Sequence, residues 1–130
     1  MLKSGDTFLI PKSPTSTPHL YIVVTDPDPN TNEAVCVNVT TEYSISDKTV
    51  RLKRGDHPFI QYNSVISYAN AELLDMVKVE AALNARITTF DCKRKAACDA
   101  ALLGLIRQGI LDSKFTPPKI KQYCKKVWRL

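Results

Sequence analysis

The stretch HLYIVVTDPDPNTNEAVCVNVTT, residues 19–41, contains two strand-like runs on either side of a proline-rich loop. The run 20–24 is apolar at every position, which predicts a central strand covered on both faces. The run 35–39 alternates, with three valines on one face, which is typical of a half-buried strand. The prolines between the runs disfavour helical geometry in the residues before them. If the two runs pair, His19 and Thr40 lie at the ends of neighbouring strands.

The segments outside this stretch predict more strands and then helices. Short runs at 7–10, 49–52, 59–60 and 64–68 read as strands separated by proline and glycine turns. Alanine- and leucine-rich segments at 71–85 and 95–109 predict helices. A final basic helix is predicted to begin with Thr116 as its cap and Pro117 in its first turn. The order predicts an α+β fold, in which a small curled antiparallel β-barrel is followed by two or three C-terminal helices.

Length and charge indicate one domain with an uneven charge distribution. A chain of 130 residues predicts a single domain, with a β-barrel part over 1–70 and a helical part over 71–130. Residues 1–90 carry eight Lys and Arg against ten Asp and Glu, whereas residues 91–130 carry ten against three. The basic last helix can attract a polyanion such as RNA. It can equally be a solvated face, or a surface for an acidic partner.

Several classes of protein are not expected from this sequence. The four cysteines show no CxxC spacing and no nearby histidine, so we expect free thiols, with no metal and no other cofactor. No apolar run reaches the roughly 20 residues of a membrane span, so no membrane association is expected. The first residues lack the apolar core of a signal peptide, which favours a cytoplasmic location.

Four segments together resemble the PemK/MazF-like toxin family. The opening LKSGDTFLI is similar to the Gly-Asp that precedes the first strand of that family. HLYIVV and VCVNVTT fall where the family has its next apolar strands, and NSVISYANAELLD resembles a later strand with the start of a helix. The resemblance covers about residues 2–75. It implies an SH3-like barrel, a bacterial toxin-antitoxin pair, metal-independent endoribonuclease activity, an antitoxin protein as partner and a homodimer.

The resemblance carries over to particular residues only in part. The family threonine at a strand end falls on Thr40, with Thr41 as the near alternative. The family arginine before the apolar strand falls on His19, and a second arginine after the later strand is replaced by residues 69–71, Ala-Asn-Ala. The sequence therefore departs from the family at two basic positions. These departures bear on RNA cleavage and not on the barrel, since the apolar pattern determines the fold.

Two histidines are the candidates for acid–base chemistry. Cleavage of RNA without a metal needs a base, an acid and a donor to the charged phosphorane, and imidazole can be the acid or the base near neutral pH. His19 and His57 are therefore candidate catalytic residues, with Asp56 placed to orient His57. The alternative is structural, because Gly-Asp-His-Pro, residues 55–58, is rich in turn-forming residues.

The remaining candidates are one further catalytic residue and three substrate-binding residues. Thr40 is a candidate catalytic donor and Thr41 a substrate-binding neighbour, while Lys53 and Arg54 can hold a phosphate. The alternative is structural: the threonines are strand formers, and the cations protect an edge strand from aggregation. Two functions follow: a toxin-type ribonuclease with an altered site, or a non-catalytic SH3-like module that binds a protein partner or RNA.

Overall fold

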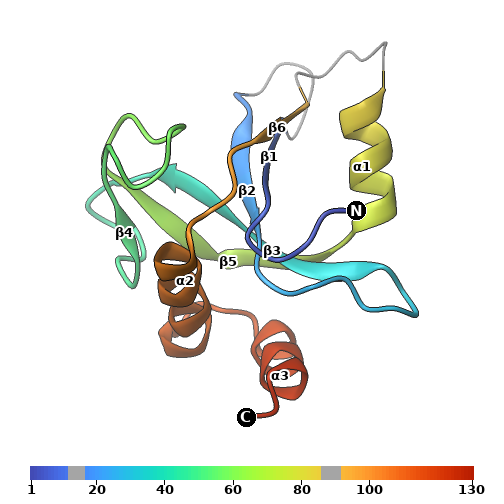
Figure 1. Cartoon of the computed structure of the whole chain (residues 1–130). Helices are drawn as coiled ribbons and strands as arrows, with labels where there is room; N and C mark the ends of the chain where they lie inside the picture. The colour runs from blue at the N-terminus through green and yellow to red at the C-terminus, as the bar shows by residue number, and fades with distance from the viewer. Residues whose placement is uncertain (12–16, 86–91) are drawn as a thin grey trace.

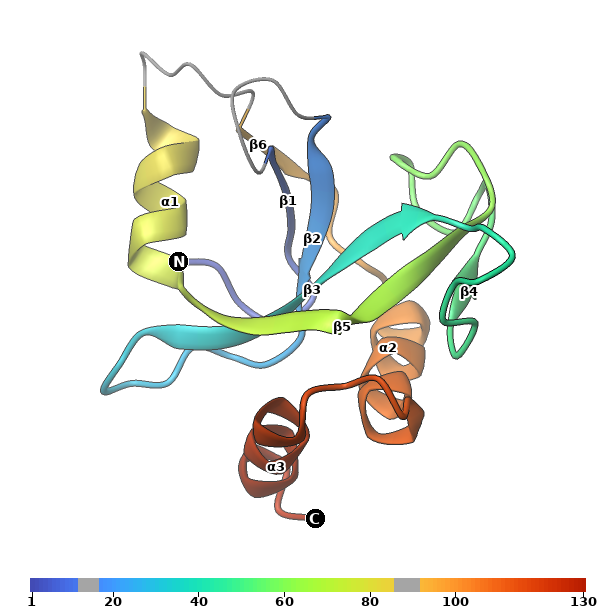
Figure 2. The same cartoon turned by 180° about the vertical axis from the view of Figure 1, so that it is seen from behind.

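The computed structural model describes residues 1–11, 17–85 and 92–130, and this part of the chain folds around one curled sheet. The strands are β1 (Thr7–Ile10), β2 (His19–Val23), β3 (Glu33–Thr41), β4 (Arg51–Leu52), β5 (Ser64–Asp75) and β6 (Lys93–Lys95). They lie in the order β4-β5-β3-β2-β1-β6, and every neighbouring pair is antiparallel. The sheet bends into a half-barrel, as Figures 1 and 2 show from opposite sides.

Helices cover both faces of this sheet. The helices of the described residues are α1 (Met76–Asn84), α2 (Ala100–Asp112) and α3 (Pro118–Val127). Helix α1 lies apart from α2 and α3 (Figures 1 and 2). The predicted α+β fold, a small curled antiparallel sheet with C-terminal helices, is confirmed, although β6 returns to the sheet between α1 and α2.

Strand β2 separates two apolar clusters, as its continuous apolar run predicts. Leu20 and Ile22 face the larger cluster, to which α2 and α3 contribute Ile106 and Ile120 among others. Tyr21 and Val23 face the smaller cluster, in which α1 places Met76 and Val79. Burial of both faces of β2 removes its apolar side chains from water, and this burial is the main driving force for assembling the sheet with its helices.

Strand β5 is longer than the pattern predicted. The helix expected from residue 71 begins at Met76, because residues 71–75 continue as strand, in which 72–75 pair with β3 from Cys36 back to Glu33. Pairing with a neighbouring strand thus outweighs the helical propensity of Ala71-Glu72-Leu73-Leu74. Asp75 then starts α1, since its carboxylate accepts hydrogen bonds from the amides of the first turn.

A bulge in β5 connects the sheet to α2. Cys36 pairs with Glu72 and Asn38 with Ser67, so β5 carries three more residues than β3 across this interval. Tyr68 lies within the bulge, fully buried, and its hydroxyl donates to the carbonyl oxygen of Ile106, at 2.9 Å. Burial is also the main cause that raises the pKa of this phenol.

Helices α2 and α3 begin later in the sequence than predicted, and α2 ends at Asp112 instead of residue 109. Helix α2 begins at Ala100, not at residue 95, because residues 93–95 form β6 and Asp99 caps the helix. Helix α3 begins at Pro118 and has no side-chain cap, since the Thr116 hydroxyl donates instead to the carbonyl oxygen of Ile110, 2.8 Å away. No helix in the described ranges is long and apolar enough to span a bilayer.

Candidate functional site

Strands β2 and β3 pair over only part of their length. Their pairing runs from Val23 opposite Cys36 to Tyr21 opposite Asn38. Beyond that point the start of β2 stays with β1, where His19 pairs with Ile10, and the end of β3 stays with β5. Figure 1 shows the two strand ends diverging. The divergence opens a space at the rim of the half-barrel, at the position where the sequence predicted a histidine and a threonine to meet.

This space is a hollow of about 480 Å³, called here the β2–β3 hollow. His19 from β2, together with Thr40 and Thr41 from β3, lines it. The structure therefore brings together three of the residues named from sequence. These residues carry an imidazole and two hydroxyls, groups that can donate and accept hydrogen bonds and, for the imidazole, exchange a proton.

Aromatic rings form much of the rest of the wall. Tyr43 follows β3, and Phe59 and Tyr62 belong to the loop before β5. The Tyr43 and Tyr62 residues are 66% and 76% exposed, so these rings are open to a ligand. The sequence reasoning missed these residues, because each is an isolated aromatic in a turn-rich segment and the fold alone brings them to one rim.

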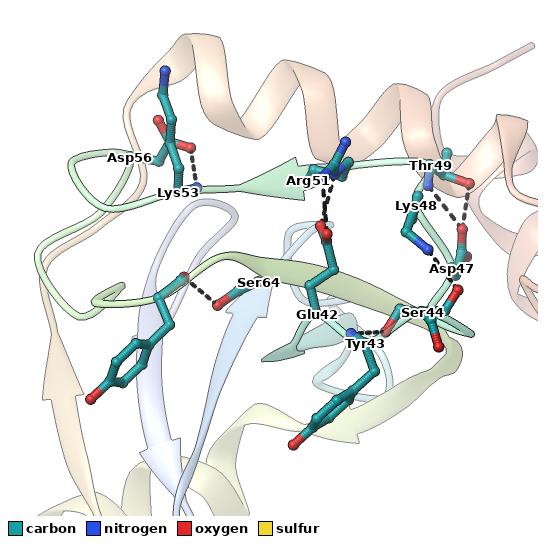
Figure 3. A network of polar contacts seen from close by, with 12 residues as sticks. Glu42, Tyr43, Ser44, Asp47, Lys48, Thr49, Arg51, Lys53, Asp56 and Ser64 are labelled. Carbon is teal, nitrogen blue, oxygen red and sulfur yellow. Dashed lines mark hydrogen bonds and ion pairs between the residues drawn. The ribbon is translucent and has the colours of Figure 1, made fainter.

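The loop that carries Tyr43 is held by polar contacts, drawn in Figure 3. Arg51 donates to both carboxylate oxygens of Glu42, at 2.7 and 2.9 Å, and these hydrogen bonds are the largest cause of the lowered pKa of Glu42. The amide of Tyr43 donates to the Ser46 hydroxyl at 2.8 Å. The aromatic ring at the rim is therefore carried by an ordered turn.

His57 lies outside this hollow and is buried, at 4% exposure. Its Nδ1 accepts from the amide of Phe59 at 3.0 Å, and its Nε2 contacts the carbonyl oxygen of Ala96. A carbonyl only accepts, so the imidazole is the tautomer that carries its proton on Nε2. Both ring nitrogens are thus occupied by backbone groups, which gives His57 a structural role in fixing the loop that carries Phe59.

Asp56 closes a turn instead of orienting His57. Its carboxylate accepts from the amide of Lys53 at 2.8 Å (Figure 3). Its own amide donates to the Lys53 carbonyl at 3.0 Å. Lys53 lines a separate hollow beside Glu42 and Arg51. The candidate set named from sequence is therefore divided: His19, with the two threonines, lies apart from the turn over 53–57.

Two cations lie in hollows next to the β2–β3 hollow. Lys95 of β6 lines a hollow that shares Phe59 and Gln61 with it. Arg54 lines another, which shares Gln61. Among the described residues that line the β2–β3 hollow there is no lysine or arginine, so this aromatic and hydroxyl-rich space has positive charge only beside it.

The described residues contain no group of three His, Cys, Asp or Glu side chains that could hold a metal ion. The chain matches no known family model and no curated protein. The PemK/MazF-like resemblance therefore stays a prediction, and the functional inference depends on the site itself.

Proposed function

We propose that this chain is an RNA-directed protein of the PemK/MazF-like toxin type, and that it binds single-stranded RNA in the β2–β3 hollow. The observation that supports this most is the meeting of His19 and Thr40 in one hollow with the exposed rings of Tyr43 and Tyr62. Unpaired bases stack on aromatic rings and hydrogen-bond through their edges. Hydroxyl, imidazole and amide groups around exposed rings are suited to both contacts.

The charge distribution supports the same proposal. Single-stranded nucleic acid is bound where bases meet a neutral aromatic surface and phosphates meet cations beside it. The hollow supplies the first, and Arg54 and Lys95 in the adjoining hollows supply the second. On this proposal Arg54 has the substrate-binding role that the sequence suggested, because Gln61 lines both its hollow and the β2–β3 hollow.

Cleavage of the bound RNA is the activity that the toxin-type proposal includes. His19 is the one imidazole that lines the β2–β3 hollow. On this proposal it takes the proton of the 2′-hydroxyl, and Thr40 donates a hydrogen bond to the phosphorane. The leaving 5′-oxygen also needs a proton. On this proposal the phenol of Tyr43 or Tyr62 donates it, because both residues are exposed and line the hollow.

A non-catalytic RNA-binding module is the second candidate. The position of His57 favours it, because both ring nitrogens of this second histidine are bonded to backbone groups. The reaction moves two protons and uses two acid–base groups at neutral pH, whereas the β2–β3 hollow has one imidazole. In this case the same residues bind RNA without cutting it.

One experiment separates these candidates. Purified protein is mixed with an end-labelled unstructured RNA in EDTA, and both binding and cleavage are measured for wild type, His19→Ala and Leu105→Ala. Leu105 is exposed on α2 and lines no hollow described here, so it is the matched control. Binding with His19-dependent cleavage supports the nuclease, and binding without cleavage supports the module. Wild-type protein that binds no RNA at low salt would overturn both.

The toxin-type proposal includes a setting as well as an activity. It includes a neutralising antitoxin protein, a homodimer and a cytoplasmic location. Expression in bacteria tests this part: we expect growth arrest with wild type and normal growth with His19→Ala at equal protein levels. Light scattering of the purified protein measures the number of subunits. Normal growth with abundant wild-type protein would remove the toxin assignment while leaving RNA binding open to the direct assay.

A further inference from the structure

A second hollow adjoins the first and shares Thr40 with it. This Phe115 hollow, as we call it, has a volume of about 220 Å³ and is lined by the turn after β3, by β5 and by Phe115 from the connection between α2 and α3. Its volume is below the range of pockets that hold drug-sized ligands, and suits a group the size of one nucleobase. Thr40 lines both hollows, so the two adjoin at the end of β3.

The walls of the Phe115 hollow are tied to each other. The hydroxyl of Ser113 donates to Asp47 Oδ2 at 2.6 Å and accepts from the amide of Phe115 at 3.1 Å. The Phe115 residue is 51% exposed, and the ammonium of Lys114 lies 5.4 Å from the centroid of its ring. A ring for stacking and a carboxylate thus line one small space, and a cation lies beside the ring. These are groups that bind the base and the phosphate of a nucleotide.

The polar groups of this hollow have a defined pattern. Asp47 is an ionised acceptor: burial alone would raise its pKa, but hydrogen bonds from Ser113 and Thr49 with the nearby Lys114 lower it. Oδ1 accepts two hydrogen bonds from Thr49 and Oδ2 accepts one from Ser113. A carboxylate has about four acceptor positions, so Oδ2 keeps one for a ligand.

Two serines of the hollow supply the opposite polarity. Ser46 accepts from the amide of Tyr43 at 2.8 Å, and Ser67 accepts from the side-chain amide of Asn70 at 2.7 Å. Each hydroxyl therefore has its hydrogen directed elsewhere and can donate to a ligand acceptor. The hollow combines a carboxylate acceptor with two hydroxyl donors.

We propose that the Phe115 hollow is a guanine-selective subsite for the RNA that occupies the β2–β3 hollow. Guanine has the acceptors O6 and N7 along one edge, and its N1–H and N2–H₂ donors are adjacent, with no acceptor between them. The serines donate to these acceptors, the remaining acceptor position on Asp47 Oδ2 takes one of the adjacent N–H donors, and Phe115 stacks on the ring. Uracil has a single N3–H, which lies between two carbonyl oxygens. These oxygens and the Asp47 carboxylate repel each other. This inference rests on the proposed RNA binding.

The test compares two RNAs that differ in one base. Fluorescence anisotropy gives dissociation constants for a labelled uridine-only oligonucleotide and for the same strand with one central guanosine. We expect wild type to bind the second about tenfold more tightly, which is within the discrimination of a good base contact. Asp47→Asn should bring the ratio of the two constants close to one. Phe115→Ala should weaken binding of the guanosine strand on the order of tenfold, since a stacking contact is lost.

Leu105→Ala is the control, because Leu105 is also an exposed apolar residue, at 61%, and lines no hollow described here. Thermal melting of each variant shows whether it is folded. If Asp47→Asn is not folded, the result for Phe115→Ala decides the test. Wild type that binds RNA with equal affinity for both strands overturns the guanine subsite and leaves the proposed function standing. Loss of affinity in Leu105→Ala equal to that in Phe115→Ala also overturns the subsite. Wild type that binds neither strand overturns the proposed function itself.

Discussion

His57 and Ala96 are in contact across 39 residues of sequence, through the imidazole Nε2 and the backbone carbonyl oxygen. Thr7 donates to the same carbonyl, at 2.7 Å, so one backbone oxygen joins strand β1 and the 57–61 loop. The two histidines of this chain therefore have different surroundings. His57 is part of the internal hydrogen bonding, and His19 lines a hollow that is open to a ligand.

His57→Ala should destabilise the fold, and His19→Ala should not. Removing the buried imidazole leaves the part-buried amide of Phe59 without its acceptor, and losing a hydrogen-bond partner costs up to about 1–3 kcal/mol. With the space it leaves, we expect a loss of about 2–4 kcal/mol in the free energy of unfolding. Urea denaturation followed by circular dichroism measures both variants. An unchanged midpoint for His57→Ala together with lost RNA activity would return His57 to the site.

Thr40→Val should weaken RNA binding without weakening the fold. Valine keeps the shape and the strand preference of threonine but removes the hydroxyl of this residue, which lines both hollows. Loss of one hydrogen bond predicts roughly a two- to tenfold rise in the dissociation constant. Thr40→Ser, which keeps the hydroxyl, should stay close to wild type. Equal losses in both variants would show that the methyl group, and not the hydroxyl, is what matters.

Gly109 of α2 should not tolerate a side chain. A Cβ atom there would lie 2.7 Å from Val50 Cγ2 and nearer still to the Tyr68 hydroxyl, so Gly109→Ala forces the helix away from the bulge of β5. We expect a destabilisation of about 1–3 kcal/mol, as for other overpacked cores. Gly104→Ala on the same helix meets nothing within 4 Å and should stabilise by about 0.5–1 kcal/mol. Chemical denaturation that gives both variants the same sign would contradict this packing.

Asp47 should contribute to stability in a pH-dependent way. Its folded-state pKa is lowered, so its contribution is present above the ordinary carboxyl pKa of about 3.9 and is lost as pH falls through the folded value. Asp47→Asn should therefore differ most from wild type near neutral pH, and the two stability curves should converge in the acid range. Thermal unfolding between neutral pH and about pH 3 measures this. Parallel curves at all pH values would contradict the hydrogen-bonded carboxylate.

Three cysteines should be poorly reactive in the folded protein. Burial raises the pKa of Cys98 and of Cys124 to about 11, and it raises that of Cys36 as well. The thiolate is the reactive form, so at pH 7.5 almost none is present. In a Cys92→Ser background, a thiol-specific disulfide reagent should react slowly with native protein and quickly after unfolding in urea. Rapid labelling without denaturant would show that these side chains are accessible.

Local sequence patterns were enough to predict the two central strands of the sheet. The continuous run over 20–24 and the alternating run over 35–39 each carry their own signal, so their pairing and the meeting of His19 with Thr40 were foreseeable. The start of α1 was not, because pairing of residues 72–75 with β3 is a tertiary contact that opposes local propensity. The same holds for Thr116, whose hydroxyl finds a carbonyl in α2.

The candidate site was less predictable for the same physical reason. His57 lies next to Asp56 in sequence, yet its partners are the backbone groups of Phe59 and Ala96. Phe115 and Asp47 were missed altogether, since Ser113 joins segments that are 66 residues apart. Residue types can suggest chemistry, but which of them share a space depends on contacts that no short window of sequence contains.

The two long-range ties also bear on how the chain can be divided. A fragment of residues 1–70 would keep the lining of the β2–β3 hollow but lose Ala96, which anchors the loop through His57. It would also lose Ser113, which holds the turn after β3 through Asp47. The C-terminal part thus holds two loops at the rim in place, so the ligand-facing rim requires both parts of the chain.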